Sequence, residues 1–503
     1  MTTKEKKKPD PTDVLGPREV VTSSELIRRL EERGVRHARK VLERSFRSKG
    51  IWRSKDLVLP GGGRLFARRT FYGDAQFLAA IEPWLKSARP GLARVLYAMD
   101  RHQALDIETV KKLVAVKLDP SGEGRHFDKE LSAVMEAGIG VTENSGTARM
   151  RLVRAKHFGT EEGKKLGFDL YAARETERRL LALLMKHFKQ QNLIAWNTPE
   201  PGFPKVYNNG QIFSAVAYSR LRPLRRLFKG SWKSCPVPFE ALARSAELFD
   251  VDGFIERLHR AGDHSRSRLR FLGVMGARSF SPEALERGKE FGLVLVNFRE
   301  LFGEVGLTAL TQAQELLAGL EANAGTEKAG SSGVLAGRLA DSIASLKNNP
   351  MVSDLCGIAL ETFTVAVLRG RNIEGVRSGL NVPFVEHGLE TTRDVDVSGF
   401  NDTEWHMVEC KAIRGSKDLD REAIRKFYLE TVPSFLKYKG KNAVSVCHAQ
   451  IWTTGKVPAE AITYLDSLKL DRRVKRGILT RDRIQVPTRI ASLSRILDVI
   501  AEL

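Results

Sequence analysis

Residues 391–413, TTRDVDVSGFNDTEWHMVECKAI, decide the fold of the C-terminal third of the chain. Polar and apolar residues alternate over 394–397, turn-forming residues fill 398–403, and an apolar run resumes over 406–413. Alternation that is bounded by turn formers is typical of β-strands. The stretch therefore predicts a β-hairpin of two strands joined at 398–403.

Charged residues recur at every second position in both predicted strands. Because successive strand side chains point to opposite faces, Asp394 and Asp396 are expected on one face, and Glu409 and Lys411 on one face. Carboxylates that are placed together repel each other unless a cation lies between them, and Mg²⁺ prefers oxygen ligands. The hairpin is therefore expected to carry a metal site. The alternate residues are expected to face the core: Val395, Val397, Val408 and Cys410.

The segments around the hairpin extend this pattern. A predicted helix over 356–368 carries an inward-facing glutamate, Glu361, and a late strand ends in a Thr-Thr-Gly turn at 453–455 before another helix. This order of helix, strand with Asp, strand with Glu-x-Lys, helix and strand resembles the PD-(D/E)xK nuclease superfamily, in particular its Mrr-like restriction endonuclease branch. The resemblance covers roughly residues 350–490, within an expected nuclease domain of residues 349–503. Arg393-Asp394 stands where such sequences often have a glutamate, which leaves the role of Asp394 open.

The resemblance implies hydrolysis of DNA phosphodiester bonds with Mg²⁺, or with Mn²⁺ in its place. Asp396 and Glu409 would hold the ion together with the backbone carbonyl of Cys410. Lys411 would orient or activate the attacking water, its pKa being lowered by the ion and by partial burial. Glu361 would add a further carboxylate, so that the catalytic set is Asp396, Glu409, Lys411 and Glu361.

Two alternatives stay open for these residues and for the whole chain. Glu409 and Lys411 could form an ordinary ion pair, with the nuclease fold decayed into a non-catalytic DNA-binding regulator or architectural protein. The other interpretation is an endonuclease of restriction or anti-phage defence. Retention of all four catalytic residues favours the enzyme, since decay is expected to lose at least one of them.

Composition indicates a basic, globular protein. Of 503 residues, 82 are Lys or Arg and 61 are Asp or Glu, which gives a net charge of +21. Double-stranded DNA is therefore the expected partner. No run of 18 apolar residues suggests a membrane span, and the charged start suggests no signal peptide, so a cytoplasmic protein is expected. The four scattered cysteines predict reduced thiols. A homodimer and partner proteins of a defence system are compatible with these features.

The N-terminal part is expected to bind DNA. Residues 1–20 predict a disordered basic tail, and residues 21–75 predict a helix, a basic helix over 35–48 and a glycine-turn hairpin, an order similar to a winged helix. A solvated basic face on a small helical domain is the alternative. The expected DNA contacts are Arg36, Arg39, Lys40, Arg44, Arg47, Arg64 and Arg68.

The remaining domains complete a multidomain α/β fold with an α+β winged-helix N-terminus. Residues 76–165 predict a helical or second winged-helix-like domain. Residues 170–305 predict a degenerate nuclease-like α/β domain that precedes the C-terminal restriction-endonuclease-like mixed sheet flanked by helices; an unrelated α/β domain is the alternative. Residues 306–348 predict a helical connector with a flexible linker over 323–333. A fragment of residues 340–503 is then expected to fold and cut alone, unless the upstream domain supports its core.

Overall fold

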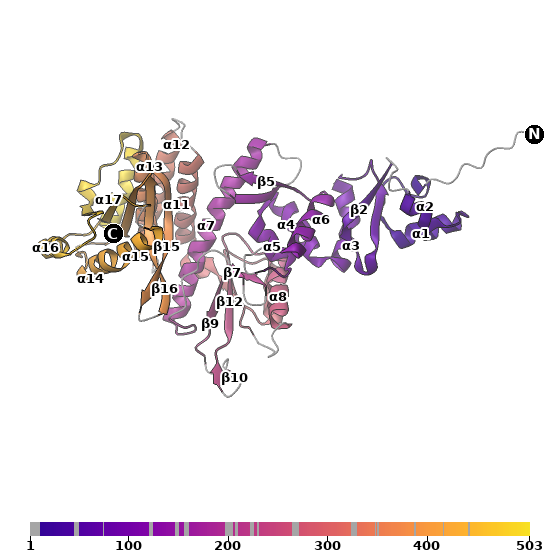
Figure 1. Ribbon diagram of the computed structural model, residues 1–503, viewed down its shortest axis with the longest axis horizontal. Coiled ribbons are helices and arrows are strands. Elements are labelled where there is room, and N and C mark those ends of the chain that lie inside the picture. Colours follow the sequence, from indigo (N-terminus) through magenta and orange to yellow (C-terminus); the bar gives the residue numbers. More distant parts are fainter. Residues whose placement is uncertain are drawn as a thin grey trace, which may run out of the picture.

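In the computed structural model, the chain runs from the N-terminal units at one end of an elongated molecule, past the long helix α7, to the C-terminal sheet at the other end (Figure 1). The fold is mixed α/β, with several separate sheets. The structure describes residues 11–44, 50–73, 75–119, 124–145, 150–154, 160–196, 205–206, 210–221, 226–228, 231–263, 271–322, 329–347, 349, 352–386, 389–415, 417–440 and 443–503.

The first unit is a three-stranded sheet with two helices, in the sheet order β1-β3-β2. Thr22 caps α1, because its side chain accepts a hydrogen bond from the Glu25 N–H at 3.2 Å. The basic helix is shorter than predicted: it begins at Ala38, since Arg36 and His37 form the preceding turn and His37 has a φ of 61°. The elements are β1 (Val21–Thr22), α1 (Ser23–Glu32), α2 (Ala38–Arg44), β2 (Ile51–Val58) and β3 (Arg64–Arg68).

The expected disordered tail is ordered over its second half. Leu15 is fully buried, and Val14 and Leu15 pack with Leu26 and Leu30 of α1. Arg68 fixes this segment by donating hydrogen bonds to the Leu15 carbonyl at 2.8 Å and to the Thr12 carbonyl at 3.1 Å. The prediction of disorder was therefore wrong for residues 11–20, because the Lys-rich composition of the start hid two apolar anchors.

The second unit repeats the arrangement of the first. A strand, two helices and two strands again form a sheet in which the last strand lies in the middle, in the order β4-β6-β5. Asp106 caps the first of these helices by accepting from the N–H groups of Glu108 and Thr109. The elements are α3 (Ala75–Ala88), α4 (Pro90–His102), β4 (Ala104–Asp106), α5 (Ile107–Val114), α6 (Arg125–Glu136), β5 (Val141–Ser145) and β6 (Met150–Arg154).

The third unit is an α/β sheet of order β14-β13-β12-β9 that lies against α7 (Thr160–Gln190). Strand β9 is antiparallel to β12, and β12, β13 and β14 are parallel. Its other elements are β7 (Lys205–Val206), β8 (Ile212–Phe213), β9 (Ala215–Tyr218), β10 (Arg226–Phe228), β11 (Ser231–Lys233), β12 (Pro236–Leu242), α8 (Leu248–Asp263), β13 (Val274–Ala277), α9 (Pro282–Phe291), β14 (Val294–Asn297) and α10 (Phe298–Phe302).

The fourth unit contains the predicted hairpin in a five-stranded sheet of order β15-β16-β17-β18-β19. Strands β15, β16 and β17 are antiparallel, whereas β17, β18 and β19 are parallel. The elements are α11 (Glu304–Ala322), α12 (Ala329–Ala344), α13 (Val352–Gly370), β15 (Glu374–Glu386), β16 (Leu389–Asn401), β17 (Glu404–Lys411), α14 (Arg421–Lys426), a π-helical turn (Phe427–Thr431), α15 (Val432–Lys439), β18 (Val446–Thr453), α16 (Ala459–Ser467), β19 (Val474–Thr480) and α17 (Ser494–Glu502).

The two larger sheets share strand order and direction. Strands β9, β12, β13 and β14 follow one another as β16, β17, β18 and β19 do, and α7 precedes one sheet as α13 precedes the other. The strand that corresponds to β17, which carries Glu409 and Lys411, is therefore β12, whereas the sequence pattern had suggested residues 211–220 for this position. That segment forms β8 and β9, and β9 corresponds to the aspartate strand β16.

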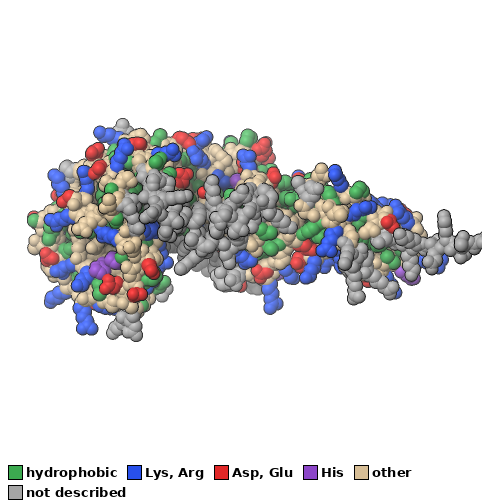
Figure 2. All heavy atoms as spheres, turned by 90° about the horizontal axis from the view of Figure 1, so that it is seen from above, with side chains coloured by type: hydrophobic (Ala, Val, Ile, Leu, Met, Phe, Trp, Pro, Cys, Tyr) green, Lys and Arg blue, Asp and Glu red, His purple; other side chains and the backbone are tan. Residues whose placement is uncertain are grey.

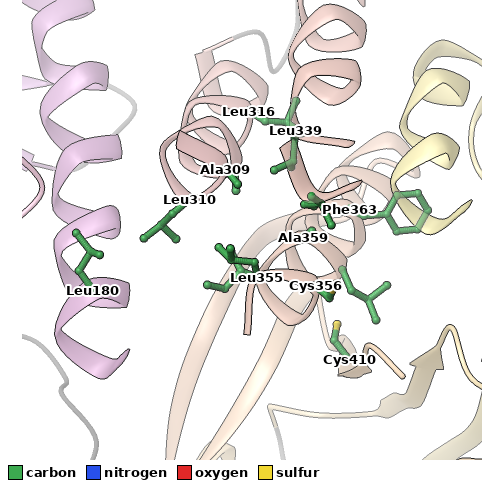
Figure 3. Close-up of a cluster of buried hydrophobic side chains, with 14 of the residues drawn as sticks. Leu180, Ala309, Leu310, Leu316, Leu339, Leu355, Cys356, Ala359, Phe363 and Cys410 are labelled. Carbon is green, nitrogen blue, oxygen red and sulfur yellow. The ribbon is translucent and has the colours of Figure 1, made fainter. Parts of the chain in front are cut away.

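A single apolar core joins the third and fourth units (Figure 3). Leu180 of α7, Leu310 of α11, Leu339 of α12 and Phe363 of α13 all belong to it. The expected linker at 323–333 is helical from residue 329 onward, while 323–328 lie outside the described residues. The two helices beside it therefore pack both units together rather than separating them.

Candidate active site at the end of the C-terminal sheet

The β16–β17 ladder opens beside Asp396. Pairing runs from Asn401 and Glu404 back to Val397 and Val408. At the next position, the Asp396 side chain takes the place of a backbone acceptor: its Oδ2 accepts a hydrogen bond from the backbone N–H of Cys410 at 2.7 Å. The turn is tighter than predicted, since strand pairing continues to residue 401. The opening leaves a carboxylate where a backbone bond would otherwise lie.

All four residues that were expected in the core are buried, but they face two cores. Val395 packs toward the helices of 421–439, whereas Val397, Val408 and Cys410 pack toward α13. The alternation is interrupted at Asp396, near Gly379 of β15, whose φ is 66°. The prediction of burial is thus confirmed for all four residues, while Val395 and Val397 belong to different cores.

Lys411 and Glu409 form an ion pair in which Nζ lies 2.5 Å from Oε1. Their side chains are 34% and 16% exposed, so the pair lies at the surface of the site. Burial alone would lower the pKa of Lys411, but Glu409 and Asp396 outweigh it and raise the pKa. This direction holds for the pair without a bound cation, so the lowering that is expected with an ion beside Lys411 stays a prediction.

The Thr-Thr-Gly turn after β18 fixes the end of β17. Thr453 Oγ1 donates to the Lys411 carbonyl at 3.0 Å, and Thr454 Oγ1 donates to the Ile413 carbonyl at 2.8 Å. A Cβ on Gly455 would lie 2.7 Å from the Ile413 Cβ, and real Cβ atoms essentially never come so close to another atom. Glycine thus lets the turn press against the segment that carries Lys411.

Glu361 reaches the site from α13, but it is paired. Arg179 of α7 donates to its Oε2 through Nη2 and to its Oε1 through Nη1 at 3.5 Å. Burial raises the pKa of Glu361, an effect that Arg179 opposes. Asp394 is exposed, and its charge acts on both Glu361 and Arg179. Sequence analysis missed Arg179, which stands 182 residues away from its partner.

The oxygen donors at this end of the sheet fit a small divalent ion. Burial, then the charges of Glu409 and Glu361, raise the pKa of Asp396 well above its ordinary value, which is the repulsion that a cation relieves. The Cys410 carbonyl points to the same strand edge as its N–H, toward Asp396. Among the described residues, no three Asp, Glu, His or Cys side chains form a metal cluster by themselves. Two carboxylates supplemented by a carbonyl and waters suit Mg²⁺.

A pocket of about 530 Å³ opens beside this group. Lys411, Arg414 and Lys417 line it, together with Asp418 and Asp420. Its three cations can contact an anionic backbone next to Lys411. Lys411 therefore lies between the carboxylates of Asp396 and Glu409 and this pocket.

In the third unit, the position that corresponds to Glu409 also carries a glutamate, Glu240, but both of its carboxylate oxygens are paired with cations. Glu240 of β12 lies where Glu409 lies in β17, and Leu242 stands in the place of Lys411. Lys112 of α5 lies 2.5 Å from Glu240 Oε1 and 2.8 Å from Ser214 Oγ, while Arg257 Nη1 donates to Glu240 Oε2 at 2.8 Å. Although burial opposes it, these two cations lower the pKa of Glu240 to about 2. This group is a buried ionic network.

The N-terminal residues that were expected to contact DNA differ in their exposure and in the hydrogen bonds and ion pairs that they already make. Arg36, Arg39 and Lys40 are exposed around the start of α2, and Arg39 makes an ion pair with Glu43 at 3.7 Å. The hydrogen bonds of Arg68 to the 11–15 segment commit its guanidinium to the fold, which speaks against the expected phosphate contact. Arg64 is partly buried. The side chain of Arg44 and the whole of Arg47 lie outside the described part of the chain.

Charge is spread over the molecule. On the face shown in Figure 2, Lys and Arg side chains lie along the whole length, with Asp and Glu side chains among them. No helix within the described ranges is long and apolar enough to cross a membrane. All four cysteines are buried and carry free thiols.

Comparisons with known proteins give distant likenesses only. No protein-family model and no curated protein matches the chain. The chain is similar to a solved complex of EndoMS with double-stranded DNA, at 13% identity and a TM-score of 0.18, and to EndoMS in its apo form, at 16% and 0.16; each likeness covers 29% of this chain and 50% of the other. A type III CRISPR defence DNA nuclease activated by cyclic oligoadenylate is similar at 12% identity and a TM-score of 0.15, over 44% of this chain and 42% of that one. The chain thus spans half or less of these proteins, and the scores define neither a family nor a function.

Proposed function

We propose that the chain is a metal-dependent endonuclease that hydrolyses phosphodiester bonds of double-stranded DNA. The observation that carries the proposal is the open β16–β17 ladder, which brings Asp396, Glu409 and Lys411 to one end of the sheet beside a basic pocket. Mg²⁺, or Mn²⁺ in its place, would be held by Asp396, Glu409 and the Cys410 carbonyl. When bound, the ion would stabilise charge on the phosphoryl oxygens and acidify a water.

The side chains of the site have separate tasks in this reaction. Asp396 is held in place by the Cys410 N–H, so its second oxygen is left to face the ion. Glu409 pairs with Lys411 and would also hold the ion, which would keep the ammonium beside the reacting phosphate. Lys411, which is paired with Glu409, would neutralise charge on the phosphate and orient the attacking water.

We also propose that the third unit is a degenerate copy of the fourth. Shared strand order and direction support a common origin, and the network of Glu240 with Lys112 and Arg257 supports the loss of catalysis. The two N-terminal units, with their repeated strand-helix-helix-strand-strand order, are proposed to hold the duplex as winged-helix-like modules. The resemblance to Mrr-like sequences supports a role in restriction or anti-phage defence in the cytoplasm.

Incubation of the full chain with supercoiled plasmid tests the proposal. We expect nicked and linear DNA with Mg²⁺ or Mn²⁺ and intact plasmid with a chelator. Folded protein that binds the plasmid but leaves it intact with either ion would identify a non-catalytic DNA-binding protein instead.

A further inference from the structure

Helix α7 belongs to the third unit, yet it reaches into the candidate active site of the fourth. Leu180, Leu181 and Leu184 anchor it in the shared core, so its position relative to α13 is fixed (Figure 3). Arg179 precedes the first of these anchors and carries the pair with Glu361. The third unit therefore supplies a cation to a site whose proposed ligands all lie in the fourth unit.

The Arg179–Glu361 pair leaves binding capacity unused. A guanidinium has five N–H donors in a planar fork, of which a carboxylate takes at most two in a bidentate pair. Arg179 Nε is buried and makes no hydrogen bond within the described part of the chain. The two side chains are 16% and 14% exposed, so the pair is largely buried and only a small part of it reaches the surface.

The surroundings of Arg179 are suited to an anion with several oxygens. The preceding residue, Arg178, lies against β15, where a Cβ on Gly379 would come 2.9 Å from its Nη1. Gly379 thus gives this second guanidinium room beside the strand that pairs with β16. Arg178 is also paired with Glu175 at 3.1 Å, so Arg179 is the arginine whose partner, Glu361, acts on Asp396. A guanidinium matches the charge and geometry of a phosphate, which it binds in a bidentate manner.

We propose that Arg179 is a phosphate-binding residue of the C-terminal site, supplied by the third unit and held on Glu361 until a DNA phosphate takes the place of that carboxylate. This inference rests on the proposed function. It makes Glu361 a positioning residue for Arg179 instead of a metal ligand. It also gives the third unit a part in cleavage although its own carboxylates are locked.

Binding at several salt concentrations isolates the contact. A short duplex is titrated with the full chain in the Lys411→Ala background, with Mg²⁺ present, and the slope of log affinity against log salt is measured. The key variant is the double substitution Arg179→Gln with Glu361→Gln, which keeps net charge and leaves no unpaired buried ion. The slope is expected to become shallower by about 0.9, the value of one phosphate contact. Arg179→Lys, which keeps the charge, is expected to retain the slope.

A second ion pair between the same helices provides the matched control. Lys186 of α7 and Asp354 of α13 lie 2.7 Å apart and are more exposed, and neither residue lines the pocket beside Lys411. The double substitution Lys186→Gln with Asp354→Asn also keeps net charge and is expected to leave the slope unchanged. An unchanged slope in the Arg179 and Glu361 double variant overturns the inference, even where the unsubstituted chain cuts plasmid. A shallower slope without any plasmid cutting supports the phosphate contact and overturns the proposed nuclease function.

Discussion

Asp396 and Lys411 carry the catalytic assignment at the scale of single residues. We expect Asp396→Ala and Lys411→Ala each to reduce plasmid nicking by at least about 100-fold, because each removes a charge that the transition state requires. Affinity for DNA should change little, since most phosphate contacts lie elsewhere. Nicking and gel-shift assays measure the two effects separately.

Glu404 offers a control on the same strand. It lies at the other end of β17, is exposed and faces His448 at 3.7 Å. Glu404→Gln is expected to nick at the unsubstituted rate. Full activity in a variant that lacks both Asp396 and Lys411 side chains would refute the assignment of the site.

His102 predicts a pH dependence of stability in the second unit. Burial, then the charge of Arg244, lower its pKa from 6.5 to about 4, and its Nε2 is buried without a partner within the described residues. The unfolded chain therefore binds the proton more readily than the folded one between pH 6.5 and 4. The stability contribution is present above pH 6.5 and is lost as the pH falls toward 4.

The size of this effect can be measured with one substitution. Between pH 7 and pH 5, protonation of His102 in the unfolded state should cost roughly 2 kcal/mol of folding stability. His102→Gln cannot take up the proton, so its free energy of unfolding should fall by that much less over the same interval. Urea unfolding at both pH values gives the comparison. An identical pH dependence in both proteins would mean that His102 is not held neutral.

Strands β12 and β17 place two glutamates in corresponding positions with different consequences. Glu240 is 2% exposed between Lys112 and Arg257, so Glu240→Gln leaves two cations short of a buried partner and should cost about 3 kcal/mol. Glu409→Gln loses only a surface-facing ion pair and should cost less than about 1 kcal/mol. Nicking is expected to disappear in Glu409→Gln. It is expected to persist in Glu240→Gln when the assay temperature is below the lowered melting temperature of that variant. The reverse pattern would exchange the roles of the two sheets.

The sequence predicted the β16–β17 hairpin well, because alternation and turn residues are local signals. It missed β12, since Pro236 and Pro238 argue against a strand inside a sheet, whereas both prolines pair with β9 in the structure. The opening of the ladder at Asp396 was also hidden, because it depends on β15 and Gly379. Contacts between distant segments, such as Arg179 with Glu361, leave no periodic trace in a single sequence.

The shared core decides how the molecule can be divided. A fragment of residues 340–503 lacks α7, α11 and most of α12, and so exposes the apolar face of α13 that these helices cover. We expect this fragment to aggregate, in agreement with the alternative that the upstream unit supports its core. A fragment of residues 160–503 retains the core and Arg179 and is expected to fold and to nick DNA with weaker affinity.

Circular dichroism and gel filtration of the two fragments check this prediction. A monomeric, folded and active 340–503 fragment would show that α7 is dispensable, and would place the boundary at the expected linker. Loss of affinity in the 160–503 fragment would follow from the missing N-terminal units, since linked binding modules raise the effective concentration of one another.

One core beneath two sheets also constrains how this protein can vary and be re-engineered. Substitutions on α11 or α12 that pack well against one unit must at the same time suit the other, so the third and fourth units cannot accumulate core changes independently. If the C-terminal unit were exchanged with that of a relative, the packing surfaces of the two units would come from proteins whose core substitutions had accumulated separately. Productive recombination points are instead expected before α7, where the exchanged piece keeps both sheets and the arginine between them.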